Sequence, residues 1–167
     1  LTDTILAQGN SKGAWIQSSS GAITGLDASM HDGDGAALHL DMQDSSLSIS
    51  HIELNSGGAT SALQIEQSEG AHIDESTIHG APGAHIENSA VTLENVDFVG
   101  ADSGNALAIF GAKSSAPVRI IGCEIENYAL AIHLEGDVDD LESQPVLIEQ
   151  SHLHATTAIE ANTLGFI

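Results

Sequence analysis

The chain has 167 residues, a length that fits one domain, and 41% of them are hydrophobic although only five are aromatic. Its 24 acidic residues face 3 basic ones, so the formal net charge is −21. This balance excludes binding to nucleic acid phosphates and to anionic membranes, because both require clustered Lys or Arg. The only cysteine, Cys123, has isoleucine neighbours, so we expect a buried core residue and no intrachain disulfide.

A four-residue pattern recurs along the chain: a small residue, an apolar residue, a residue of any type and a second apolar residue. Its successive copies are 24, 25, 21, 23, 25 and 27 residues apart. In chain order the copies are Gly13-Ala14-Trp15-Ile16, Ala37-Leu38-His39-Leu40, Ala62-Leu63-Gln64-Ile65, Gly83-Ala84-His85-Ile86, Ala106-Leu107-Ala108-Ile109, Ala131-Ile132-His133-Leu134 and Thr157-Ala158-Ile159-Glu160-Ala161.

A second pattern follows the copies. It consists of two pairs of apolar residues; the members of a pair are separated by one residue, and two residues, the two-residue step, separate the first pair from the second. Its members are Leu47, Ile49, Ile52 and Leu54; Ala71, Ile73, Ser76 and Ile78; Val91, Leu93, Val96 and Phe98; Val118, Ile120, Cys123 and Ile125; and Val146, Ile148, Ser151 and Leu153. An imperfect earlier copy is aligned as Ile23, Gly25, Ala28 and Met30. In the five full repeats, 28 of the 30 aligned positions are apolar, whereas the composition alone predicts about 12.

Alternation with period two predicts strands with one buried face, and the two-residue step predicts a bend between two strands of one coil. So small a unit must stack on its neighbours to bury its apolar side. The repeat therefore predicts an all-β fold, a right-handed parallel β-helix (solenoid) of roughly seven coils. Residues 1–167 would form one segment of a larger protein. An amphipathic helix, a leucine-rich repeat and a nonapeptide calcium roll do not fit this frame.

Two insertions lengthen the turns, and insertions in solenoids often lie on the binding face. One runs from Phe110 to Pro117 and the other from Glu135 to Gln144. The predicted partner-binding residues are Lys113, Ser114 and Ser115 in the first loop and Asp137, Asp139, Asp140 and Glu142 in the second. The three aspartates could also surround a hard cation such as calcium, but an exposed acidic loop in an already acidic protein is the favoured interpretation.

The nine histidines raise the question of a metal site. His39, His85 and His133 occupy one outward column, but Gln64 and Ala108 interrupt it, so no shared ion is predicted. Protonation of the histidines would instead offset almost half of the net charge. We predict no metal and no cofactor.

Catalytic residues are not predicted. The basic residues Lys12, Lys113 and Arg119 fall in different coils, which disfavours a polysaccharide lyase, whereas paired acids are too abundant to identify a hydrolase. An exposed surface for stacking sugars would have to use Trp15 and Tyr128.

The segments Ser45–Leu54 and Ala90–Phe98, and the stretch Gly35–Leu40, resemble coils of pertactin-like autotransporter passengers. The resemblance implies a bacterial surface or secreted protein, anchored in the outer membrane through a region outside this sequence. It also implies adhesion or binding of host factors, with few cysteines. This sequence departs from adhesive passengers in lacking an Arg-Gly-Asp tripeptide.

We therefore expect a non-catalytic, surface-displayed or secreted β-helical module whose partner is a protein or glycan on a host or neighbouring cell. A fragment of a carbohydrate-active β-helix enzyme is the alternative. Self-association through a flank or through the coil ends is a third expectation, because open coil ends expose unpaired strand edges.

Overall fold

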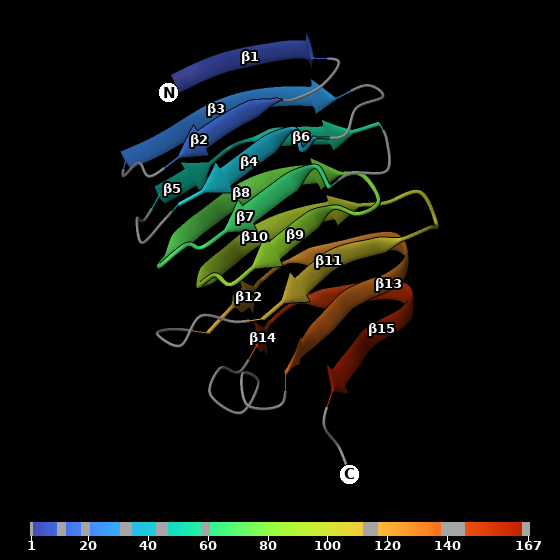
Figure 1. Cartoon of the computed structure of the whole chain (residues 1–167). Coiled ribbons are helices and arrows are strands. Elements are labelled where there is room, and N and C mark those ends of the chain that lie inside the picture. Colours follow the sequence, from blue (N-terminus) through green and yellow to red (C-terminus); the bar gives the residue numbers. More distant parts are fainter. Residues whose placement is uncertain are drawn as a thin grey trace.

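The computed structural model describes residues 2–9, 13–17, 21–30, 35–42, 47–57, 61–111, 117–137 and 146–164. These residues are all-β, without a helix, and their parallel strands form a solenoid of about 5 turns (Figure 1). The strands are β1 (Thr2–Gly9), β2 (Ala14–Gln17), β3 (Gly21–Met30), β4 (Leu38–Asp41), β5 (Leu47–Ser50), β6 (Glu53–Ser56), β7 (Leu63–Glu66), β8 (Ala71–His79), β9 (Ala84–Glu87), β10 (Val91–Val99), β11 (Asn105–Phe110), β12 (Arg119–Ile121), β13 (Glu124–Asp137), β14 (Leu147–Glu149) and β15 (His152–Leu164).

The parallel solenoid predicted from the repeat is confirmed, but the number of coils was overestimated. The sequence predicts roughly seven coils, whereas the structure forms about 5 turns.

Strand pairing places each turn on three faces. Face 1 contains β2, β4, β7, β9 and β11 with the second halves of β13 and β15. Face 2 contains β5, β12 and β14, together with the first halves of β3, β8 and β10. Face 3 contains β6, together with the second halves of β3, β8 and β10 and the first halves of β13 and β15. Figure 1 shows β4, β7, β9 and β11 of face 1 stacked in sequence order.

Apolar side chains form continuous files through the interior. On face 2 the paired residues are Ile23, Ile49, Ile73, Leu93, Ile120 and Ile148. On face 1 they are Ala14, Leu38, Leu63, Ala84, Leu107, Ile132 and Ile159. Ile73 and Leu93 are completely buried, and burial of such a side chain stabilises the fold by roughly 1.5–3 kcal/mol. In the last described turn, Ile148 and Ile159 are exposed, because no described strand stacks beyond them.

The alignment predicted for the imperfect copy at residues 23–30 is wrong by two residues. Ile23 pairs with Ile49 rather than lying level with Leu47, and Ala28 pairs with Leu54. Gly21 pairs with Leu47, and a glycine carries no side chain that could mark this position in the sequence pattern.

The two-residue step coincides with the bend between faces 2 and 3, as predicted. One residue at each of these bends has a positive φ, in the left-handed region that Gly and Asn adopt most easily. The series is Gly25, His51, Glu75, Asn95, Gly122 and Gln150, with φ between 45° and 67°. The left-handed residue turns the chain without breaking the stacking of neighbouring coils.

Serine at two otherwise apolar positions has a structural role beside this bend. Ser76 Oγ accepts a hydrogen bond from Ile52 N at 3.2 Å and donates to Asp74 O at 2.7 Å. Ser151 Oγ likewise accepts from the backbone N of Cys123 at 3.1 Å. These hydroxyls thus bridge adjacent turns and satisfy backbone groups at the bend.

Cys123 occupies the position equivalent to Ser76 and Ser151, and it is buried, as the sequence predicts. Its Sγ contacts the carbonyl oxygens of Leu93 and Ile121, each at 3.5 Å. Burial raises the pKa of the Cys123 thiol, which disfavours the reactive thiolate. Cys123 is therefore a packing residue of the core.

Close stacking of the turns predicts that Gly100→Ala is destabilising. A Cβ atom at this position would overlap the carbonyl oxygen of Asn127 in the next turn and lie 2.8 Å from the Tyr128 ring. We expect a loss of about 1–3 kcal/mol in the free energy of unfolding, measured by urea titration. Ala101→Ser, at the exposed neighbouring position, should leave the midpoint unchanged. Equal stability of the two variants would contradict the described stacking.

Candidate binding surface

The side chains of the residues predicted to contact a partner lie outside the part of the chain that the structure describes. Asp137 is the last residue of β13 and pairs with Leu164, but its side chain is outside the described part of the chain. The other six predicted residues also lie outside the described residues: Lys113, Ser114, Ser115, Asp139, Asp140 and Glu142. They remain predictions. Phe110, assigned from sequence to the first loop, is instead the last residue of β11.

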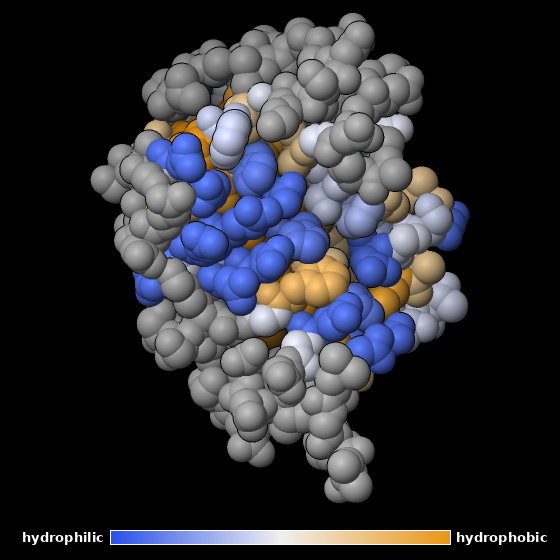
Figure 2. All heavy atoms as spheres, viewed as in Figure 1, coloured by the Kyte–Doolittle hydropathy of each residue, from blue (hydrophilic) through white to orange (hydrophobic). Residues whose placement is uncertain are grey.

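Face 1 presents two outward columns of side chains. The first column consists of Trp15, His39, Gln64, His85, Ala108, His133 and Glu160. The second consists of Gln17, Asp41, Glu66, Glu87, Phe110, Glu135 and Asn162. Parallel pairing spaces successive members by roughly 4.8 Å. Figure 2 shows this side of the molecule as mostly hydrophilic, with a hydrophobic patch among the polar side chains.

Histidines contact glutamates on each of the three faces. On face 1, the Nε2–Oε2 distances are 3.6 Å for His39–Glu66, 3.5 Å for His85–Glu87 and 3.5 Å for His133–Glu135. The other contacts are His51–Glu75 at 2.8 Å, His72–Glu94 at 3.1 Å and His79–Glu53 at 3.7 Å. Four of these six contacts join neighbouring turns. Each is partly exposed, so a single pair contributes about 0–1 kcal/mol to stability.

Aromatic rings lie along face 1 as well. Phe110 stacks on His85, with ring centroids 4.8 Å apart, and also contacts the His133 ring at 6.0 Å. Ala108, which lies between these histidines in the first column, leaves the space that the Phe110 ring occupies. At the other end of the face, Trp15 stacks on His39 with a centroid distance of 5.8 Å and an interplanar angle of 25°.

Of the two residues on which a sugar-stacking surface would have to rely, Tyr128 is unavailable. Its side chain is 2% exposed and lies in the core, close to Gly83 and Gly100, where there is room because these residues have no side chain. The Tyr128 hydroxyl has no hydrogen-bond partner, and burial raises its pKa. Trp15, by contrast, is 54% exposed.

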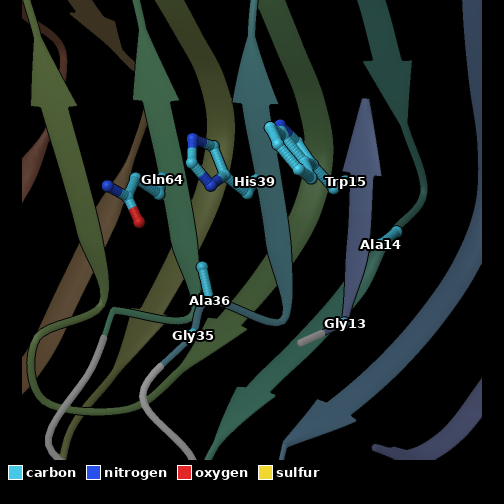
Figure 3. A pocket seen from close by; sticks show the side chains of 7 residues that line it. All are labelled: Gly13, Ala14, Trp15, Gly35, Ala36, His39 and Gln64. Carbon is cyan, nitrogen blue, oxygen red and sulfur yellow. The ribbon is translucent and has the colours of Figure 1, made fainter. Parts of the chain in front are cut away.

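A hollow of about 220 Å³ adjoins the Trp15–His39 stack (Figure 3). It is lined by Gly13, Ala14, Trp15, Gly35, Ala36, His39 and Gln64. Four of these residues are Gly or Ala, so the backbone forms much of the wall. At position 13 a side chain is excluded, because its Cβ would overlap the carbonyl oxygen of Ala37.

Glu66 contacts the polar groups beside the hollow. Gln64 Nε2 donates to Glu66 Oε1 at 2.5 Å, and His39 Nε2 lies 3.6 Å from Glu66 Oε2. The His39 Nε2 atom is buried and makes no hydrogen bond. Glu66 therefore orients the Gln64 amide and lies close to the His39 ring, without itself lining the hollow.

The described residues contain no group of three or more His, Cys, Asp or Glu side chains arranged to hold a metal ion. The interrupted histidine column is observed as predicted, with Gln64 and Ala108 between the three histidines of face 1. Arg119 pairs with Glu149 at 2.7 Å. In the part of the chain that the structure describes, no helix is long and apolar enough to span a membrane.

Comparisons with protein-family models, with curated proteins and with solved structures gave no match. The fold and the geometry of face 1 therefore carry the functional argument.

Proposed function

We propose that this chain is a non-catalytic solenoid module that binds a partner through face 1. The observation that carries this proposal is the pair of in-register outward columns, which hold rings and carboxylates on seven parallel strands. Side chains mounted on such a ladder are already fixed in spacing before a partner arrives. Little conformational entropy is then lost on binding, which favours affinity.

The charge of the chain supports a defined range of partners. A net charge of −21 attracts basic surfaces and accelerates association with them. It disfavours nucleic acids, because their phosphates would be repelled. We propose as partner a protein or glycan on a host or neighbouring cell.

The resemblance to pertactin-like passengers is the support for display at a bacterial cell surface or for secretion. Adhesion or host-factor binding is the function that this resemblance favours. Self-association remains a further prediction, and sedimentation over a range of concentrations would test it.

The alternative, a carbohydrate-active enzyme, requires carboxyl groups converging on the sugar. Retaining glycosidases place two of them about 5–5.5 Å apart, across the bond that is cleaved. Among the described residues, none that lines the hollow beside Trp15 carries a carboxylate. This lining favours binding over hydrolysis at that position.

The proposal predicts saturable binding that depends on face 1. Purified chain would be applied to a printed glycan array and to a panel of immobilised extracellular matrix proteins. We expect binding to at least one of them, weakened by about tenfold or more in the variant Glu66→Ala, Glu87→Ala, Glu135→Ala, a factor equal to ~1.4 kcal/mol.

A second triple variant is the control: Glu53→Ala, Glu75→Ala, Glu94→Ala. It removes the same number of histidine-contacting glutamates from faces 2 and 3 and the bend between them. It should bind like the unaltered chain. Absence of binding, equal weakening in both variants, or release of reducing sugar from the bound glycan would contradict the proposal.

A further inference from the structure

Resting on the proposed function of face 1, we propose that the hollow beside Trp15 is a subsite for one uncharged sugar residue of a glycan. The proposal thus names an uncharged sugar as the ligand and the hollow as its binding site. Three features support it: the exposed Trp15 ring, the residues that line the hollow and the size of the hollow.

The Trp15 indole provides the platform. It is 54% exposed, and its stacking on His39 fixes the orientation of the ring. An indole joins a large apolar surface to a polar N–H group, which suits a partner with both characters. A sugar ring has such a character, because its C–H groups form an apolar patch while its hydroxyl groups lie around the edge.

The lining of the hollow favours an uncharged ligand. The seven described residues that line it include no Asp, Glu, Lys or Arg. Two described acids on the neighbouring strands already have partners: Glu66 contacts Gln64 and His39, and Asp41 accepts a hydrogen bond from Gln17 Nε2 at 3.1 Å. A cationic ligand over the indole would need an unpaired carboxylate beside it for strong binding, and an acidic sugar would be repelled by the chain.

The size of the hollow fits a single ring. Its volume of about 220 Å³ is smaller than the ~300–1,000 Å³ of pockets that hold drug-sized ligands. The glycine and alanine residues that form its wall leave this space open beside the indole. Further sugar residues of a chain would extend along the outward columns of face 1.

Gln64 provides the hydrogen bonds that hydroxyl groups require. Its amide has two N–H donors and one carbonyl acceptor, and only one of the donors is used in the bond to Glu66. Figure 3 shows the Gln64 amide, the His39 ring and the Trp15 ring in a row on the same side of the sheet, with His39 in the middle. The bond to Glu66 holds this amide in place, so the platform and the polar group have a fixed relative position.

Trp15 is the single tryptophan of the chain, so its fluorescence reports on the subsite directly. The probes are the neutral hexasaccharides cellohexaose, mannohexaose and chitohexaose, with hexagalacturonate as the acidic comparison. We expect at least one neutral probe to shift the emission of Trp15 and to bind in calorimetry, and the acidic probe to do neither.

Variants at the subsite should then separate stacking from hydrogen bonding. Trp15→Ala should weaken calorimetric binding of the neutral probe by about tenfold or more, corresponding to ~1.4 kcal/mol, whereas Trp15→Phe should retain most of it. His39→Ala and Gln64→Ala should each weaken binding several-fold. His72→Ala is the matched control for His39→Ala, because both histidines contact a glutamate in the next turn, and it should bind normally.

The subsite is overturned if no neutral hexasaccharide binds, or if Trp15→Ala binds as well as the unaltered chain. If a partner from the array still depends on the face 1 glutamates in that case, the proposed function stands and only the sugar subsite is wrong. If the face 1 glutamates are also dispensable, both proposals are wrong.

Discussion

The vertical spacing of parallel strands, roughly 4.8 Å, is the constraint on which the whole structure depends. Equivalent residues of successive turns lie directly over one another, so each interior position must suit the same position one turn away. Ile49, Ile73 and Leu93 satisfy this requirement in the core. The same spacing acts on the outside, where it arranges histidines, glutamates and aromatic rings in columns. A face for binding thus results from the same register that builds the core.

The sequence predicts the interior well, because apolar residues recur with the period of the structure. The face 1 register from Ala14 to Ile159 is confirmed at every predicted copy. The copy at Ile23 is misaligned by the pattern. Glycines at positions 21 and 25 remove the side chains that would define the frame, and the remaining apolar residues fit two alignments equally well. The apolar pattern also gives no reason for its two serines, Ser76 and Ser151, which the structure explains by their hydrogen bonds at the bend.

The outward face was less predictable, because solvent-facing positions have no required chemistry and therefore no periodic signal. The predicted loop residues lie outside the described part of the chain, whereas the hollow is formed by residues to which the sequence assigned no common site. One signal was present: the frame of Gly13–Ile16 already puts Trp15 in the column of His39. The hollow itself depends on Gly35 and Ala36 lying beside this column, a proximity that no sequence period reports. The buried state of Tyr128 likewise follows from packing against Gly83 and Gly100 in neighbouring turns.

Cross-linking of paired positions tests the register most directly. In a Cys123→Ser background, Ser48→Cys with His72→Cys joins adjacent turns, and Ser48→Cys with Thr92→Cys spans two turns. Disulfides require Cα atoms within about 7 Å, a distance that adjacent strands satisfy and strands two turns apart, at roughly 10 Å, do not. Mild oxidation should cross-link the first pair rapidly and leave the second pair reduced. Cross-linking of the second pair, or failure of the first, would contradict the stacked register and every proposal built on it.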